Sequence, residues 1–368
     1  MRWARWVRAP SGTNCEQRPM GNGLTRRRSI LSVVVLAAAC SSATGWSPDD
    51  ALGVSTAEEH TCAWASSGAW CWGRNHRGQI GEGSTTDRLL PARMHALDSL
   101  SGLAVRSERT CSWSASGEVS CWGGDWGNSP VPITNVPGVE GLALGDVDVF
   151  AWTEDGSVAA VEGMGGSGLA DVREVVSALE RLRFCGLTAT REVWCWPNES
   201  DDPSDASLDY APRLLPEPSA VVGLSMSRVH ACAVLEEGSV ACWGANGSGQ
   251  LGDATTEPRE APTRVPGVSD IRGVVVGAWH SCAWSVGGRA WCWGSNAHGQ
   301  LGDGTSVERH TPSPVVDLTD VQSMSAAGFH TCAATREHGL FCWGYNAFGQ
   351  LGDGTTRDRY EPVHLTLD

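Results

Sequence analysis

A segment that recurs at intervals of 50 residues in the second half of the chain constrains its fold more than any other feature. Each copy opens with Cys-Trp-Gly and continues with an Asn and a Gly-Gln-Leu-Gly or Gly-Gln-Ile-Gly sequence. Four copies are plain: CWGRNHRGQIGEGST from Cys71, CWGANGSGQLGDATT from Cys242, CWGSNAHGQLGDGTS from Cys292 and CWGYNAFGQLGDGTT from Cys342. Repeats of 20 to 50 residues indicate a fold in which one small unit is used many times.

A second cysteine lies nine or ten residues before the one that opens each copy. The same spacing occurs twice more, and it identifies two weaker copies of the repeat. The six pairs are Cys62 and Cys71, Cys111 and Cys121, Cys185 and Cys195, Cys232 and Cys242, Cys282 and Cys292, and Cys332 and Cys342. A seventh copy has Phe150 and Ala160 in place of both cysteines. The joint loss is what a bonded pair predicts, because one orphan thiol is a liability in an oxidising compartment. We therefore expect seven repeats.

Each repeat reads as four short strands. In the sixth, apolar and β-branched runs bounded by Gly or Pro predict strands at 262–265, 271–276, 280–284 and 289–293. The turn at Gly287 and Gly288 would place Cys282 opposite Cys292 on antiparallel neighbours, within disulfide reach. One disulfide per cysteine-bearing repeat is predicted; the alternative is reduced cysteines that only pack.

A four-stranded unit repeated radially predicts an all-β fold, a seven-bladed β-propeller. The first repeat, at 51–54, lacks the Pro-x-x-Val strand that precedes the other copies, whereas the C-terminus has a spare one at 362–365. We therefore expect the C-terminal strand to complete the first blade and close the ring.

The pattern of a His-x-Cys strand, a glycine turn and Cys-Trp-Gly-x-Asn-x-x-Gly-Gln-Leu-Gly-Asp-Gly-Thr resembles the regulator-of-chromosome-condensation repeat, from about Ala51 onward. The resemblance implies a seven-bladed propeller that serves as a protein-binding platform. Functions in that family are diverse, and they include guanine-nucleotide exchange, ultraviolet-B reception and inhibition of a secreted enzyme. A fold alone does not settle the activity.

The N-terminus is typical of an export signal. A basic cluster at Arg26-Arg27-Arg28 is followed by the apolar run 30–39, too short for a membrane-spanning helix. We expect residues 1–39 to be a signal peptide, with Met20 as a second plausible start. Cys40 follows Leu-Ala-Ala-Ala and resembles a lipobox cysteine, which predicts lipidation, a tether over 40–50 and a propeller over 51–368. Cleavage without lipidation is the alternative.

The charge of the exported part limits its partners. Residues 1–39 hold seven Arg and one Glu, which leaves 20 basic and 41 acidic residues from Cys40 onward. Such a surface repels nucleic acid and anionic lipid. We therefore predict no nucleic-acid partner, and membrane contact only through the lipid. The export signal predicts a location in the cell envelope, as an outer-membrane lipoprotein or else periplasmic or extracellular. We expect the protein to be a monomer.

Recurring polar residues have a structural interpretation and a ligand interpretation. One histidine per repeat (His60, His230, His280 and His330) would lie too far from its equivalents in a ring to share a metal ion, so hydrogen bonding is expected. The repeated asparagines (Asn75, Asn246, Asn296 and Asn346) are expected to form turns. The Asp-Gly pairs at Asp303 and Asp353 lack the alternating acidic ligands of a calcium loop. No metal or cofactor is predicted.

Tryptophans fall into two groups. Those that follow the second cysteine, namely Trp72, Trp122, Trp196, Trp243, Trp293 and Trp343, are expected to pack between blades. Trp126 and Trp279 lie where the repeat fixes no residue and are candidates for a binding face. Copies two to four have lost the Gly-Gln-Leu-Gly-Asp segment, which marks either specialised loops for a partner or drift.

No catalytic motif occurs in the sequence. Scattered carboxylates (Glu58, Glu59, Asp146 and Asp148) could serve as acid and base in a glycosidase, but a solvated surface role is the simpler interpretation. The sequence therefore favours a non-catalytic protein-binding propeller of the cell envelope, for recognition or adhesion. The alternatives are an inhibitor or regulator of a secreted enzyme, and a polysaccharide hydrolase.

Overall fold

The computed structural model describes residues 53–94, 97, 100–145, 148–162, 169–177, 182–197, 212–336 and 339–367. These residues form strands and one 3-10 helix, η1 (Gly124–Trp126). The predicted signal peptide, Cys40 and the tether lie outside the described residues, so their assignments stay predictions.

The described strands form seven antiparallel sheets, which we call blades I to VII. Blades I to III contain β1 (Gly53–Thr56), β2 (His60–Ala65), β3 (Gly68–Gly73) and β4 (Arg88–Met94); β5 (Leu100–Arg106), β6 (Arg109–Ser114), β7 (Glu118–Trp122) and β8 (Val131–Asn135); and β9 (Val139–Leu144), β10 (Val149–Thr153) and β11 (Val158–Glu162). Blades IV and V contain β12 (Val172–Ser177), β13 (Leu182–Thr188), β14 (Val193–Pro197) and β15 (Arg213–Leu215); and β16 (Val221–Met226), β17 (His230–Leu235), β18 (Val240–Gly244) and β19 (Arg259–Arg264). Blades VI and VII contain β20 (Ile271–Val276), β21 (His280–Ser285), β22 (Ala290–Gly294) and β23 (Arg309–Pro314); and β24 (Val321–Ala327), β25 (His330–Thr335), β26 (Gly339–Gly344) and β27 (Arg359–Leu365).

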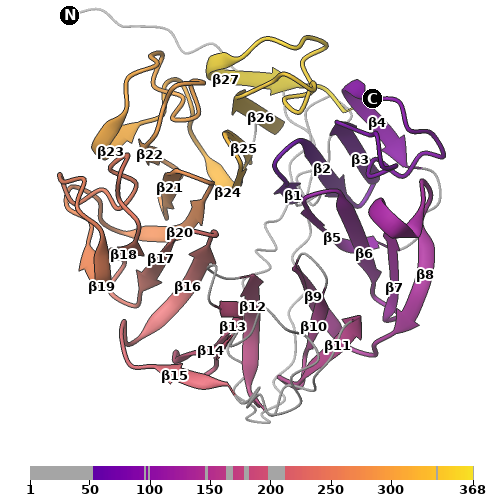
Figure 1. Cartoon of the computed structure of the whole chain (residues 1–368), viewed down its shortest axis with the longest axis horizontal. Coiled ribbons are helices and arrows are strands. Elements are labelled where there is room, and N and C mark those ends of the chain that lie inside the picture. The colour runs from indigo at the N-terminus through magenta and orange to yellow at the C-terminus, as the bar shows by residue number, and fades with distance from the viewer. Residues whose placement is uncertain are drawn as a thin grey trace, which may run out of the picture. The chain divides into compact units, whose positions relative to one another are not determined.

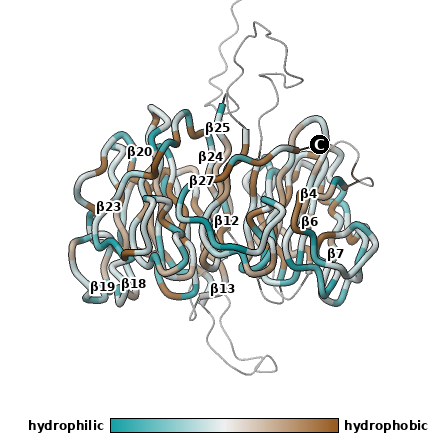
Figure 2. Tube along the Cα trace, turned by 90° about the horizontal axis from the view of Figure 1, so that it is seen from above, coloured by the Kyte–Doolittle hydropathy of each residue, from teal (hydrophilic) through white to brown (hydrophobic). Residues whose placement is uncertain are grey.

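The seven blades are arranged in a ring, which confirms the predicted seven-bladed β-propeller (Figure 1). Six blades have four strands, and blade III has three within the described residues. The first strand of each blade lies nearest the centre, and the strands follow one another outward in sequence order. Figure 2, turned by 90°, shows the blades from the side, with their loops at two opposite faces.

Six disulfides join the second and third strands of six blades, at the pairs expected from the cysteine spacing. Cys282 and Cys292 are register partners with Cα atoms 4.1 Å apart. In blade III the same register positions hold Phe150 and Ala160, which pair directly. Phe150 fills this place by packing edge-on against Phe184 of blade IV, with ring centroids 4.6 Å apart.

The Pro-x-x-Val strand does not begin a blade, and in this respect the prediction is wrong. β19, which overlaps the predicted 262–265 strand, pairs with β18 and forms the outer edge of blade V rather than the start of blade VI. The loop before it is fixed to its own blade: Asn246 donates to the carbonyl of Glu257 at 3.0 Å, and Arg259 donates to Asp253 at 2.8 Å. These bonds return the chain alongside the Cys-Trp-Gly strand that it has just left.

The predicted ring closure is wrong for the same reason. β27 pairs with β26 and completes blade VII, while blade I builds all four of its strands from its own repeat. Blades VII and I instead meet through side chains and loop backbone, including a bond from Gly354 N to Leu89 O at 2.8 Å. Thr56 N donates to Ser325 Oγ at 3.0 Å, and Trp72 packs with Leu351 and Leu365 in one buried cluster. The ring therefore closes with the same kind of interface that joins its other blades.

Candidate functional site: the loop face and the central cavity

The tryptophans that follow the second cysteine pack between blades, as predicted. Trp293 is fully buried, and its indole N–H donates to the carbonyl of Gln250 in the preceding blade at 2.9 Å. The bond recurs from Trp72 to Gln350, from Trp122 to Gln79 and from Trp343 to Gln300. Trp243 and Trp196 also lie in clusters that span two blades. These side chains are part of the scaffold and present nothing to a ligand.

The recurring histidines hold the same interfaces. Nε2 of His280 lies 2.9 Å from the hydroxyl of Thr331 in the next blade, and that hydroxyl donates to the carbonyl of Gln300 at 3.1 Å. Because the single hydroxyl proton goes to the carbonyl, the histidine must donate from Nε2. The same arrangement joins His60 to Thr110, His230 to Ser281 and His330 to Thr61. Burial lowers the pKa of each of the four imidazoles to about 3. The rings are therefore neutral hydrogen-bonding groups.

The repeated asparagine organises the loop that follows it. Asn296 accepts from the backbone N–H of Leu301 at 3.1 Å, and its amide donates to Asp303 and to the carbonyl of Val307. Asp303 also accepts from Arg309 at 2.8 Å. The predicted role of these asparagines as turn formers is confirmed by these bonds. Across the described residues, no three His, Cys, Asp or Glu side chains gather where they could hold a metal ion.

The turns and loops of the blades emerge on two opposite faces of the ring. Because the strands alternate in direction, the turn between the first and second strands and the loop between the third and fourth strands of a blade emerge on the same side. Backbone bonds join them, as from Ser295 N to Trp279 O at 2.8 Å. We call this side the loop face. The turns between the second and third strands emerge on the opposite face.

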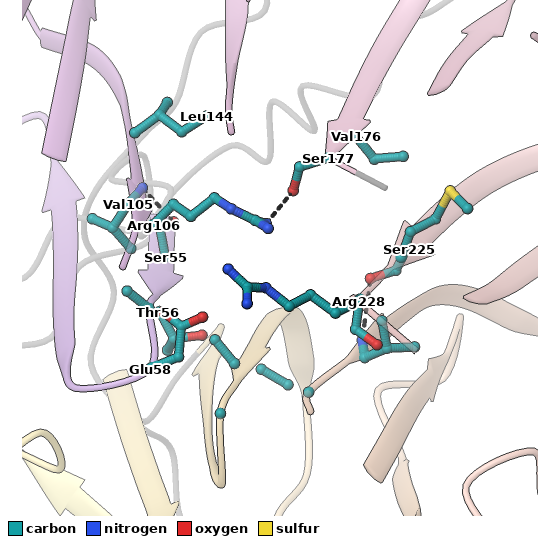
Figure 3. A pocket seen from close by; sticks show the side chains of 18 of the residues that line it. Ser55, Thr56, Glu58, Val105, Arg106, Leu144, Val176, Ser177, Ser225 and Arg228 are labelled. Atoms are coloured by element: carbon teal, nitrogen blue, oxygen red, sulfur yellow. Dashed lines mark hydrogen bonds between the residues drawn. The ribbon is translucent and has the colours of Figure 1, made fainter. Parts of the chain in front are cut away.

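A cavity of about 440 Å³ lies at the centre of the ring. The first strands of all seven blades and the turns that follow several of them line it, which places it at the loop face. Its walls are small, hydroxylated or aliphatic side chains, such as those of Ser55, Val176 and Ser225 (Figure 3). Trp279 lines its rim and is 38% exposed.

Two arginines from different sides of the ring extend into this cavity. Figure 3 shows Arg106 of blade II and Arg228 of blade V with their guanidinium groups pointing toward the centre. Arg106 Nη1 donates to the hydroxyl of Ser177 at 2.6 Å, which orients it. Glu58 lines the cavity from blade I and accepts from the backbone N–H of Ser107 at 3.0 Å.

Trp126 and Trp279 lie on the same face but do not form one site. Trp279 belongs to an inner turn of blade VI, whereas Trp126 ends η1 in the outer loop of blade II. Trp126 is half-buried, with the Arg109 guanidinium 4.9 Å from its ring centre. Their role in binding stays a prediction.

A group of aromatic side chains on the loop face joins Trp279, already a candidate from the sequence, to four residues that the sequence did not reveal. We call it the aromatic arc, and it consists of Trp279, His298, Phe329, Tyr345 and Phe348. His298 lies 5.5 Å from Phe329 and 4.7 Å from Tyr345, measured between ring centres. Tyr345 contacts Phe348 at 6.4 Å.

The arc extends over blades VI and VII and contacts blade I at one end. The turn of Trp279 is joined to that of Phe329 by a bond from Ala278 N to Gly328 O at 2.9 Å. At the other end, the Arg74 guanidinium of blade I lies 4.5 Å from the ring centre of Phe348. Trp279 and Phe329 both directly precede the repeated histidine, so aligning the repeats on that histidine would have revealed two of its members.

The candidate acid and base carboxylates are not brought together. Glu59 pairs with Arg74, Asp148 is buried at the histidine position of blade III, and Glu58 lies at the cavity. Asp146 lies outside the described residues. Arg106 and Arg228 were also not singled out from the sequence. An alignment of the repeats would have shown them, because Ala57, Ala278 and Gly328 occupy the equivalent positions in other copies.

The fold and the repeated interface define the chain as a seven-bladed propeller built from one repeat. Residues 237–284, 287–334 and 337–368 match the regulator of chromosome condensation (RCC1) repeat, and a second description of that repeat matches 221–250, 271–300 and 321–350. The C-terminal region therefore matches the RCC1 repeat, in agreement with the resemblance seen in the sequence.

Known proteins with similar sequence are much longer than the matching part. The ultraviolet-B receptor UVR8 of Arabidopsis thaliana is 30% identical over 254 residues, 58% of this chain and 58% of the receptor. The E3 ubiquitin-protein ligase HERC2 of Mus musculus is 25% identical over 217 residues, 55% of this chain and 4% of the ligase. The chain thus spans less than two thirds of either relative.

The crystal structure of human WBSCR16 has a similar fold. It superposes with a TM-score of 0.69 at 19% identity and covers 81% of this chain and 93% of that one. At this identity the likeness concerns the fold alone. No helix in the described part of the chain has the length and apolar character needed to cross a membrane.

Proposed function

We propose that the chain is a non-catalytic recognition propeller of the cell envelope that binds a protein partner through its loop face. The observation that carries the proposal is the aromatic arc, which spans blades VI and VII beside the central cavity and contacts Arg74 of blade I. Aromatic residues and arginine are enriched at the centres of protein interfaces, because they supply large contact areas at low entropic cost.

The chemistry of the chain supports an exported protein. Six disulfides are typical of an extracellular or otherwise oxidising environment. The predicted signal peptide and the lipidation of Cys40 would place the propeller in that environment. The excess of acidic residues from Cys40 onward disfavours nucleic acid as a partner. A relative named as a receptor, UVR8, is consistent with a binding role.

The alternative of an inhibitor or regulator of a secreted enzyme uses the same face and differs only in what the partner does. A polysaccharide hydrolase has less support, because Glu59 is engaged by Arg74 and Asp148 is buried. We therefore propose binding without turnover, by a monomeric propeller.

Affinity capture from envelope extracts tests the proposal. The bait is the chain from Ser41 onward, compared with the double variant Trp279→Ala, Phe348→Ala and with Trp126→Ala. The matched control is Val286→Ala, because Val286 is 72% exposed on the opposite face. Direct binding is then measured with the purified partner.

We expect one partner at a one-to-one ratio, at least about tenfold weaker binding by the arc variant, and unchanged binding by the control. Equal capture by the arc variant and the wild-type chain would assign binding to another surface. If the captured partner is an enzyme, loss of its activity at one equivalent of propeller would identify the inhibitor alternative.

A further inference from the structure

The central cavity contains charged groups that the repeat does not supply. Arg228 lies two residues before His230, at the place of Ala278 in blade VI and Gly328 in blade VII. Arg106 lies four residues before Thr110, at the place of Ala57, which lies four residues before Thr61. Small residues at these turns are sufficient to build a blade. The two arginines therefore add charged groups to the cavity that the repeat itself does not require.

The two guanidinium groups enter the cavity from separate blades. Both point toward its centre in Figure 3, and Arg106 is oriented by its bond to Ser177. A guanidinium carries five N–H donors in a planar fork, so it can keep structural partners and also hold a ligand. That fork matches the two oxygens of a carboxylate.

Hydroxyl groups at the cavity are also held in place. Ser55 Oγ accepts from the backbone N–H of Val105 at 3.3 Å, and Ser225 Oγ accepts from that of Val276 at 3.1 Å. Each bond crosses from one blade to the next and uses the serine oxygen as an acceptor. The hydroxyl proton of each serine therefore remains a donor, which suits an anionic ligand.

Part of the remaining wall is apolar, and the Glu58 side chain also lines the cavity from blade I. Leu144, Val176 and Met226 line the cavity together with the indole of Trp279. A binding site of this kind, with an apolar wall and a few directed polar groups, suits a small organic molecule, and 440 Å³ lies in the usual size range of such sites. A multiply charged anion is disfavoured, because the chain from Cys40 onward has 41 acidic and 20 basic residues.

We propose that the central cavity binds a small organic monocarboxylate, with its carboxylate between Arg106 and Arg228 and its apolar body against the aliphatic wall and Trp279. This site is independent of protein docking by the aromatic arc, apart from the shared Trp279. A failure to find a protein partner therefore leaves it unaffected.

Isothermal titration calorimetry on the disulfide-intact protein at neutral pH and low salt tests the site, with benzoate as the probe. Three control ligands are compared with benzoate. Acetate lacks the apolar ring, benzylamine has the opposite charge, and inorganic phosphate is an anion with no apolar group. We expect saturable one-to-one binding of benzoate, at least about tenfold weaker binding of acetate and phosphate, and no binding of benzylamine.

The variants locate the binding. Arg106→Gln and Arg228→Gln should each weaken benzoate about 10- to 100-fold, whereas Arg289→Gln, an exposed arginine on the opposite face, should leave it unchanged. Ser177→Ala removes only the hydroxyl that orients Arg106, so it tests the site if an arginine variant folds poorly. A several-fold loss is expected. Near-ultraviolet circular dichroism checks the fold of each variant.

Three results would overturn the proposal. They are no saturable benzoate binding to the wild-type protein, phosphate binding as tightly as benzoate, and benzoate binding that is unchanged in folded Arg106→Gln, Arg228→Gln and Ser177→Ala proteins.

Discussion

Four buried histidines connect the stability of the ring to pH. Each donates from Nε2 to a hydroxyl of the next blade, and burial lowers its pKa from 6.5 to about 3. Below pH 6.5 the unfolded chain binds protons that the folded ring does not. This contribution to stability is therefore fully present above pH 6.5 and is lost as the pH falls toward 3.

The expected loss is up to about 1.4 kcal/mol per pH unit for each histidine. We expect the free energy of unfolding, measured with urea, to fall between pH 6.5 and 5. The variant His280→Gln should make this fall with pH less steep by the contribution of one histidine. His310→Gln, at a partly exposed site, is the comparison variant. An unaltered slope in His280→Gln would contradict a neutral imidazole at the interface.

A second feature at the residue scale is the pairing of glycine with tryptophan across the first two strands of a blade. A Cβ added at Gly273 would lie 2.2 Å from the ring of Trp284, and the same contact occurs at Gly53, Gly102 and Gly141 with their own tryptophans. Glycine is needed here because the indole lies flat on the neighbouring strand.

Gly223 of blade V offers a matched comparison, because its cross-strand neighbour is Val234 and a Cβ would meet it at 3.9 Å. We expect Gly273→Ala to destabilise the protein by about 1–3 kcal/mol, since the tryptophan must move. Gly223→Ala should be near neutral. Thermal or urea unfolding of both variants measures the difference, and equal effects would contradict the steric explanation.

At the scale of the element, each disulfide joins adjacent strands of one blade across a short hairpin. The double variant Cys282→Ala, Cys292→Ala removes one bond and leaves no orphan thiol. For a closed loop of this length, we expect a loss of about 2–3 kcal/mol, by the chain-entropy argument. Unfolding in urea under non-reducing conditions measures it.

Blade III shows that a blade can form without this bond, since Phe150 and Ala160 occupy its place. The double variant should therefore remain a folded propeller with native near-ultraviolet circular dichroism. A chain that loses its tertiary structure would show that the bond is required for folding rather than only stabilising.

At the scale of the whole molecule, the ring is closed by contacts between blades VII and I and not by exchange of a strand. β27 belongs to blade VII, so deletion of residues 359–368 should expose the edge of β26. We expect faster amide exchange at Leu340 and Cys342 of β26, together with a lower melting temperature.

The amides of β3 are the internal control. They pair with β4 of their own repeat, so the deletion should leave their exchange slow. Rapid exchange in β3 and not in β26 would support a closure in which the C-terminal strand completes the first blade. Hydrogen exchange read by mass spectrometry distinguishes the two results.

The sequence by itself determined the seven repeats, the all-β class and the cysteine pairs. These features are local, because a hairpin whose cysteines are ten positions apart decides its own pairing. The interblade role of Trp293 and its equivalents was also predictable, since a large apolar residue repeated once per blade must be buried.

Only the tertiary structure decided which blade receives each Pro-x-x-Val strand, because that choice depends on loop bonds such as Arg259 to Asp253. It also decided which variable residues meet. Arg106 and Arg228 lie more than a hundred residues apart in the sequence, and the aromatic arc draws on two blades. A radial fold brings equivalent turns of every repeat around one axis. Residues that look isolated along the chain therefore become neighbours at the cavity and on the loop face.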